Sequence, residues 1–247
     1  MSGHSKWSTI KRKKEKTDNQ RAKIFTKIGR EIAVVVREGG PDPASNSKLK
    51  DVIAKAKANN VPNDNIERII KKAAGETGGA DYEEIGYEGY GPSGVAVIVE
   101  ALTDSRNRTA GDVRHYFDKY GGNMGMSGCV SFMFSKQGIL VVEAEGVDED
   151  KLMEDAIECG AMDFITDDEE IYAIRTDAND LGAVTAALQE KGYTFVSSET
   201  AYIPQTYTRI EDQDNMKGMS KMLDLFDDND DIQNVWHNWE MPEEDEE

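Results

Sequence analysis

The stretch VAVIVEAL at residues 95–102 is followed, after a short polar turn, by RNRTAGDVRHYFDKY at residues 106–120. The first segment is almost entirely apolar and rich in β-branched residues, and it therefore predicts a buried strand. The second segment predicts a helix. A strand that leads into a helix predicts a small α/β unit in the middle of the chain.

Strands and helices continue to alternate downstream of this unit. Strands are expected at residues 129–134, 139–144, 170–175, from 195 and at 232–237, and helices at 149–160, 179–191 and 216–226. This alternation predicts small ferredoxin-like α/β sandwiches. Residues 95–134 supply only part of one sandwich, so the C-terminal residues are expected to complete it around an inserted domain.

Three short amphipathic helices are expected upstream of the central unit. In the first, Ile24, Ile28 and Ile32 recur at helical spacing and form one apolar face. Asp64 is expected to cap the third helix. Three such helices in sequence predict a small bundle.

The predicted fold class is therefore α+β, with an N-terminal three-helix bundle and two small ferredoxin-like α/β domains, one of them discontinuous. A glycine-rich stretch, Gly75 to Gly79, follows the bundle and could serve as a hinge. The expected domains are residues 1–78, residues 79–134 with 205–247, and residues 135–204.

Charge is divided unequally along the chain. The 247 residues hold 29 Lys and Arg against 48 Asp and Glu, a net charge of −19, yet residues 1–78 have a balance of +9 and the remainder −28. This asymmetry indicates either a basic module for a polyanion or a basic tail that keeps the protein in solution. The acidic remainder does not exclude nucleic acid, because charges are screened beyond a Debye length of ~8 Å.

Positive charge concentrates in an N-terminal arm and along the first predicted helix. Lys23, Lys27 and Arg30 lie on successive helical turns and form a basic stripe suited to phosphates. His4 and Trp7 in the arm could stack on unpaired bases, although Trp7 could equally anchor the arm to the bundle.

A second basic cluster lies at the turn between the central strand and helix. Its arginines, Arg106 and Arg108, could bind an anion at the helix N-terminus, or the helix could simply be capped by Ser105 or Asp104. The candidate nucleic-acid-binding residues are His4, Lys6, Trp7, Lys11, Arg12, Lys13, Lys14, Arg21, Lys23, Lys27, Arg30, Arg106 and Arg108.

Patterns typical of enzymes fail on their structural requirements. Residues 89–94 match G-x-G-x-x-G, but a dinucleotide site must open a helix, whereas these glycines precede a strand and predict a tight loop. Asp227, Asn229 and Asp231 have the spacing of a calcium loop without its later glycine and glutamate. These acids are expected to be a solvated helix end. We therefore expect no catalytic residues, no enzyme activity, no cofactor and no small-molecule substrate.

Histidines and cysteines do not suggest a metal site either. The three histidines are scattered, and Cys129 and Cys159 are 30 positions apart with no C-x-x-C, so no metal site is expected. Cysteine usage of this kind fits a reducing compartment. No apolar run approaches the ~20 residues of a membrane span, and no secretory signal is evident at the start. A cytoplasmic protein is expected.

Several short motifs resemble those of the YebC/PmpR family. They are GHSKW at 3–7, KIFTK at 23–27, NIER at 65–68, YEGYGP at 87–92, LTD at 102–104 with NRT at 107–109, GGN at 121–123 and SFMF at 131–134. The resemblance covers essentially the whole chain, and the order of separated motifs makes it specific. It departs conservatively at Cys129, Phe132 and Trp236, where the family usually has a small residue, Trp and Tyr.

The resemblance implies three domains and a cytoplasmic protein without enzyme activity. Bacterial members are described as DNA-binding transcriptional regulators, a mitochondrial relative as a translational activator, and bacterial members have also been linked to stalled ribosomes. The two resulting hypotheses are a DNA-binding transcriptional regulator and a translation factor that binds rRNA in the ribosome and relieves stalled elongation.

Overall fold

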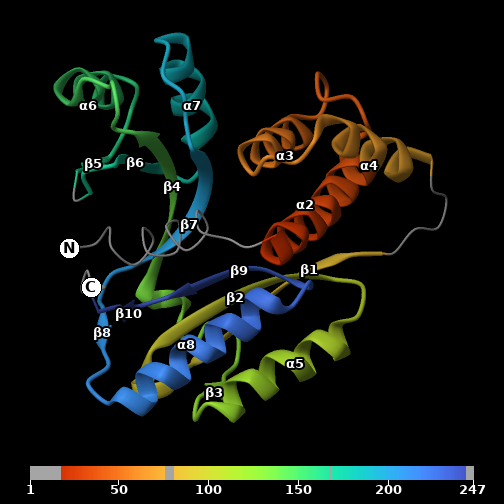
Figure 1. Ribbon diagram of the computed structural model, residues 1–247, viewed down its shortest axis with the longest axis vertical. Helices are drawn as coiled ribbons and strands as arrows, with labels where there is room; N and C mark the ends of the chain where they lie inside the picture. Colours follow the sequence, from red (N-terminus) through yellow and green to blue (C-terminus); the bar gives the residue numbers. More distant parts are fainter. Residues whose placement is uncertain (1–17, 76–80, 167, 243–247) are drawn as a thin grey trace. The chain divides into compact units, whose positions relative to one another are not determined.

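The computed structural model describes residues 18–75, 81–166 and 168–242 (Figure 1). They divide into a large unit, the described part of Lys11–Phe132 with Tyr207–Glu240, and a small unit, the described part of Met133–Thr206 with Met241 and Pro242. No helix among these residues is long and apolar enough to cross a membrane.

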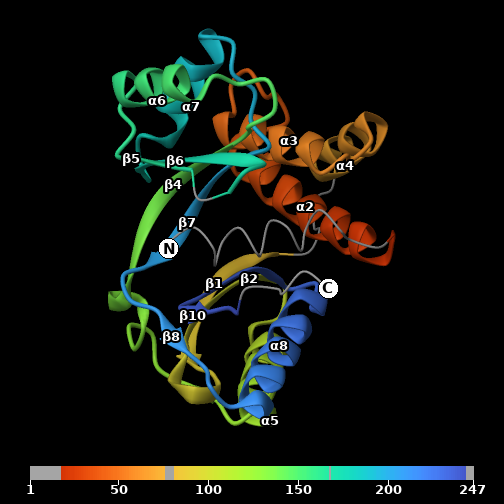
Figure 2. The ribbon, with the colours of Figure 1, turned by 60° about the vertical axis from the view of Figure 1, so that its left-hand side comes forward.

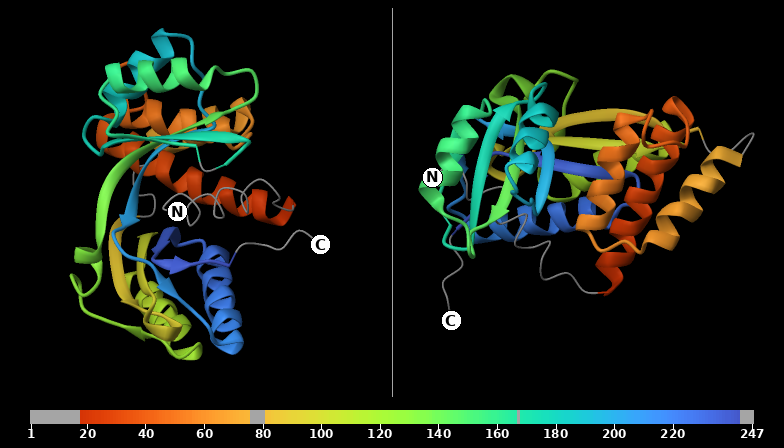
Figure 3. Two further views of the ribbon diagram at one scale, coloured as in Figure 1. Left: turned by 90° about the vertical axis from the view of Figure 1, so that its left-hand side faces the viewer. Right: turned by 90° about the horizontal axis from the view of Figure 1, so that it is seen from above.

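The N-terminal bundle contains α2 (Asp18–Gly39), α3 (Ser47–Ala58) and α4 (Asn63–Gly75), coloured red to orange in Figure 3. The predicted apolar face of α2 forms the core of the bundle together with apolar residues of α3, of α4 and of the turn between these two helices. The buried members are Ile28, Ile32, Val36, Leu49, Ala56, Val61 and Ile66. The expected cap Asp64 lies one residue inside the start of α4.

Asn46 joins α2 to α3 and is itself buried. Its side-chain oxygen accepts the backbone N–H of Leu49 and caps α3, while its amide donates to the carbonyls of Val35 and Gly40 at the end of α2. One side chain thus binds backbone groups at two helix ends, where such groups often lack intrahelical partners.

The rest of the large unit is a four-stranded antiparallel sheet with two helices. In chain order its elements are β1 (Glu83–Tyr90), β2 (Ala96–Thr103), α5 (Arg106–Lys119), β3 (Asn123–Met124), α8 (Gln213–Asp228) and β9 (Ile232–His237). The strand order is β3-β1-β2-β9, so a C-terminal strand completes a sheet begun before residue 125. Helices α5 and α8 lie together on one face of this sheet (Figures 1 and 2), and the rings of Phe117 and Phe226 meet edge to face between them.

Two short strands and a 3₁₀ turn also belong to this unit. β8 (Thr208–Arg209) pairs in parallel with β10 (Trp239–Glu240). A 3₁₀ turn at Pro92–Gly94 lies in the tight loop expected between Gly89 and Gly94, and Gly94 has the positive φ of +77° that favours glycine there.

The small unit repeats the strand–helix alternation in a second sheet. Its elements are β4 (Phe134–Glu143), α6 (Glu149–Glu158), β5 (Asp163–Ile165), β6 (Ile171–Asp177), α7 (Leu181–Glu190) and β7 (Ser197–Pro204). The βαββαβ order and the antiparallel arrangement β5-β6-β4-β7 are ferredoxin-like. Figure 2 shows α6 and α7 on one face of the sheet, over a core that includes Leu140, Leu152 and Ile174.

This architecture confirms the predicted α+β fold class. The three domain boundaries stay a prediction. One expected strand, Cys129–Phe134, is wrong: the segment contains a 3₁₀ turn at Ser131–Met133, and the strand begins only at Phe134. Conversely, strand β1 was not expected, because EEIGYEGY contains few apolar residues; it forms by pairing with β2 and β3 on its two sides.

Candidate nucleic-acid interface

The basic stripe of α2, Lys23, Lys27 and Arg30, is in contact with an acidic segment of the same unit. We call this segment the acidic turn; it spans residues 227–231, Asp-Asp-Asn-Asp-Asp, where α8 ends and β9 begins. Lys23 forms an ion pair with Asp228. The Lys27 ammonium donates to the Asp227 carbonyl over 3.1 Å.

Arg30 makes the third contact of the stripe, and it reaches furthest inward. Its Nη1 donates to the Asp230 carbonyl over 3.0 Å and to Oδ1 of Asp231 over 2.6 Å. Its guanidinium also lies 5.4 Å from the centre of the Tyr82 ring. Each cation of the stripe thus has an oxygen of the acidic turn as a partner.

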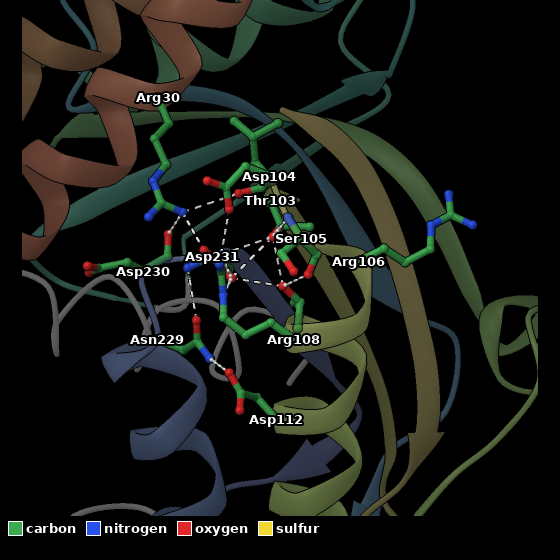
Figure 4. Close-up of polar contacts among 12 residues, drawn as sticks. Arg30, Thr103, Asp104, Ser105, Arg106, Arg108, Asp112, Asn229, Asp230 and Asp231 are labelled. Atoms are coloured by element: carbon green, nitrogen blue, oxygen red, sulfur yellow. Dashed lines mark hydrogen bonds and ion pairs between the residues drawn. The ribbon is translucent and has the colours of Figure 1, made fainter. Parts of the chain in front are cut away.

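Asp231 is the centre of a buried polar network (Figure 4). Only 4% of this residue is exposed. Its Oδ1 accepts a hydrogen bond from Arg30. Its Oδ2 accepts hydrogen bonds from Nη2 of Arg108 over 2.7 Å, from Nε of Arg108 over 3.0 Å and from the Thr109 hydroxyl over 2.8 Å. The Thr103 hydroxyl donates to the same Oδ2 over 3.2 Å. One carboxylate therefore connects α2, the end of β2 and the first turns of α5.

The backbone around Asp231 is fixed by neighbouring elements. Its carbonyl accepts the N–H of Leu102, which extends the pairing of β2 with β9, and its N–H donates to the side-chain oxygen of Asn229. The amide of Asn229 donates in turn to Asp112 and Tyr116 on α5. The acidic turn is consequently attached to the sheet and to α5.

The charge of Asp231 is stabilised by its partners. Burial opposes ionisation, but hydrogen bonds from Arg30, Arg108 and Thr109 outweigh it and hold the pKa of Asp231 below its ordinary value. The same contact with Asp231, and then that with Asp104, raises the pKa of Arg108. The expectation of a solvated helix end is therefore wrong for Asp231, although Asp227 and Asp228 are exposed.

The two arginines of the β2–α5 turn point in different directions. Arg108 turns inward to Asp231, whereas Arg106 extends away from the network (Figure 4) and pairs with Glu83 at 2.9 Å. Ser105 occupies the capping position of α5 without a side-chain capping bond. Instead, its N–H donates to the Thr103 hydroxyl over 2.9 Å.

The remaining candidates lie in the arm or at its junction with α2. His4, Lys6, Trp7, Lys11, Arg12, Lys13 and Lys14 are outside the described residues, and Arg21 belongs to α2 although its side chain is also outside the description. Sequence reasoning passed over further basic side chains of the bundle. The exposed ones on α3 and α4 are Lys48, Lys50, Lys57, Arg68, Lys71 and Lys72, and Arg37 is exposed on α2. Those of α3 and α4 lie opposite the apolar face of their helices, a position that helical periodicity could have revealed.

Sequence reasoning also missed Glu88, a carboxylate of β1 that organises a loop. It accepts the backbone N–H groups of Gly128, Val130 and Ser131, each over 2.8 Å. Burial opposes its ionisation, but these donors hold its pKa below the ordinary value. No sequence signal distinguishes Glu88 from the other acids of this segment, because its donors come from forty residues downstream.

The part of the chain that the structure describes contains no cluster of three or more His, Cys, Asp or Glu able to hold a metal ion.

Comparisons with known proteins match the chain along nearly its whole length. The family model described as "TACO1/YebC protein N-terminal domain" matches residues 5–76, and "TACO1/YebC second and third domain" matches residues 82–239. A protein of Acetivibrio thermocellus is 59% identical over 97% of this chain and 99% of its own length, and one of Ruminiclostridium cellulolyticum is 59% identical over 100% of both. Each is named "Probable transcriptional regulatory protein".

A solved structure shares the fold. The crystal structure of the conserved hypothetical protein Aq1575 from Aquifex aeolicus matches with a TM-score of 0.83 and 45% identity, over 93% of this chain and 94% of that one. Together with the domain matches, this similarity shows that the chain belongs to the TACO1/YebC family.

Proposed function

We propose that this protein is a cytoplasmic, DNA-binding transcriptional regulator that acts without catalysis. The observation that carries the proposal is the segregation of charge, +9 in residues 1–78 against −28 in the rest. The name shared by its relatives, probable transcriptional regulatory protein, supports the same reading.

The bundle has the properties of a phosphate-binding module. Its apolar residues are used in its own core, so its charged side chains are left on the outside. Lys50 and Lys57 are exposed two helical turns apart on α3, and Lys71 is 80% exposed on α4. Such side chains, with the arm, would neutralise phosphates and release counterions, which is the main source of affinity in non-specific DNA binding.

The second candidate is a translation factor that binds rRNA in the ribosome. The observation that favours it is the chemistry of α2. Reading bases in the major groove requires Asn, Gln or Arg side chains directed at base edges, and the arginine of the stripe, Arg30, is already held by Asp231. A basic stripe that binds phosphates without reading bases suits folded rRNA as well as DNA.

One experiment separates these candidates. The full chain is sedimented with ribosomes over a salt series in the presence of competing duplex DNA. Release to the DNA at matched salt supports transcriptional regulation, whereas retention on ribosomes supports the translation factor. Binding to neither would refute the proposal.

The role of the arm is tested by replacing Lys11, Arg12, Lys13 and Lys14 with Ala. If about six phosphates are engaged, affinity of the natural chain should fall roughly 10³-fold between 50 and 200 mM salt. The variant should bind more weakly and with a flatter salt dependence. A control with the same charge change outside the basic module replaces Lys119, Lys151, Lys217 and Lys221 with Ala; equal losses in both variants would remove the arm from the mechanism.

A further inference from the structure

The basic stripe of α2 and the acidic turn are matched in position. Lys23, Lys27 and Arg30 project at steps of four and three residues. The two lysines meet the start of the acidic turn, at Asp228 and Asp227, and Arg30 meets its end, at Asp230 and Asp231. Two of these four contacts are made by carboxylates and two by backbone carbonyls. The stripe therefore faces a row of anionic and partly negative oxygens, as it would on a phosphate backbone.

The acidic residues at the end of α8 are unfavourable for that helix. Asp227 and Asp228 occupy its last turn, which contains no basic residue. The C-terminus of a helix carries partial negative charge, so acids in this turn weaken the helix. Lys23 and Lys27 offset that repulsion from outside the helix. A local arrangement that opposes helix stability and is compensated by a distant element is typical of a functional feature.

We propose that the acidic turn is an autoinhibitory phosphate mimic, which covers the basic stripe of α2 until a nucleic acid displaces it. This inference rests on the proposed nucleic-acid-binding function and concerns its regulation. The bound and covered states compete for the two lysines of the stripe, Lys23 and Lys27, so the affinity of the whole protein is lower than its basic module alone would have.

The contacts between the stripe and the acidic turn differ in their exposure to solvent, and the exposed ones are the easier to displace. Lys23 and Asp228 form a pair in which the Asp228 side chain is 62% exposed, so the pair is screened by salt and easily exchanged for phosphate. Arg30 and Asp231 form the buried end, with 18% and 5% of their side chains exposed. The outer contacts can therefore open while Asp231 keeps the turn attached to β2 and α5.

The bundle can release the turn without losing its own core. Its buried residues, including Ile28 and Ile32, pack within the bundle, and the contacts from Lys23, Lys27 and Arg30 to the turn are polar. Exchange of one set of oxygens for another leaves the apolar residues of α2 buried.

The test removes the two exposed charges at the α8 end of the acidic turn, which lie beside Lys23 and Lys27, and leaves the backbone carbonyl of Asp227 in place. Binding of a short DNA duplex of mixed sequence is measured by fluorescence anisotropy at low salt. The test variant is Asp227→Asn with Asp228→Asn. The control variant, Asp118→Asn with Asp214→Asn, removes the same charge from exposed positions; Asp214 is about 21 Å along α8 from Asp228. We expect a gain of about fivefold or more for the test variant and less than about twofold for the control.

A second measurement shows whether the gain acts through the stripe. The same Asp227→Asn and Asp228→Asn changes are made in a chain that carries Lys23→Ala and Lys27→Ala. If the acidic turn covers the stripe, the gain disappears in this background, because the two pairs of changes are not additive. A gain that persists, or one equal to that of the control, overturns the inference.

Failure of the inference is distinguishable from failure of the proposed function. Arm-dependent DNA binding of the natural chain, with no gain in the Asp227→Asn and Asp228→Asn variant, overturns only the inference. Absence of binding by every variant, at low salt and with unchanged melting temperatures, refutes both.

Discussion

Replacement of Asp231 by Asn should destabilise the large unit more than any other single charge removal in the acidic turn. The side chains are nearly the same size, so the change removes the charge and turns one accepting oxygen into a donor. Arg30 and Arg108 both lose an ionic partner. We therefore expect an effect from electrostatics and hydrogen bonding rather than from packing.

The magnitude follows from the exposure of the partners. Breaking a fully buried ion pair costs about 3–5 kcal/mol. Arg30 is 18% exposed, so most of that penalty applies, whereas Arg108 is 48% exposed and recovers part of its hydration. We expect a loss of about 2–4 kcal/mol, which corresponds to a decrease in melting temperature of about 5–12 °C in a unit of this size.

The effect should depend on pH in a defined direction. The pKa of Asp231 is held below its ordinary value, so the carboxylate contributes stability above the unfolded pKa of about 3.9. That contribution is lost as the pH falls through the lower pKa of the folded state. The difference between the natural chain and the variant should therefore be constant from neutral pH to about pH 5 and should shrink below about pH 4.

Tryptophan fluorescence can report this transition. Trp236 and Trp239 lie in β9 and β10, close in sequence to Asp231, and a Trp7→Phe background removes the signal of the arm. The matched control is Asp230→Asn, because that side chain is exposed and only its backbone carbonyl contacts Arg30. Melting of the Asp231 variant within about 1 °C of the natural chain, or an equal loss in the control, would refute the reasoning.

Two further changes test other parts of the fold. Glu88→Gln leaves backbone N–H groups without a charged acceptor, so it should lower the free energy of unfolding by about 1–3 kcal/mol. It should also accelerate amide hydrogen exchange in the loop at 128–131. The control Glu84→Gln, an exposed change on the same strand, should do neither. Gly138→Ala would place a Cβ 2.2 Å from the Thr176 hydroxyl oxygen, so it should lower the melting temperature of the small unit by overpacking that costs about 1–3 kcal/mol. Gly182→Ala has open space at its Cβ and should be neutral or stabilising in circular-dichroism melts.

Elements with a clear apolar period could be predicted from the sequence. The strand expected at 232–237 is β9 with the same bounds, and the helix expected at 149–160 is α6, Glu149–Glu158. In both, local periodicity and burial agree. The segment at Cys129–Phe134 has the composition of a strand, but the N–H groups of Val130 and Ser131 are bound by Glu88 instead of by a neighbouring strand. Local composition could not predict an acceptor forty residues away.

The sequence by itself determined the family, the α+β class, the apolar faces of the helices and the basic character of residues 1–78. These properties follow from residue type and short-range spacing, which tertiary contacts do not change. Only the tertiary structure decided the role of Asp231. Within DDNDD it is one of four aspartates, and nothing local distinguishes it from Asp227 or Asp228.

Burial separates these aspartates, and burial depends on the whole fold. Pairing of β9 with β2 brings Asp231 beside Thr103 and Arg108, while α2 supplies Arg30 from two hundred residues away. Contacts of the same kind bring all three members of the predicted basic stripe against the chain's own acidic turn. Charge pattern in a sequence gives the sign of a surface, but the partner of each charge is set by distant segments that meet only in the folded protein.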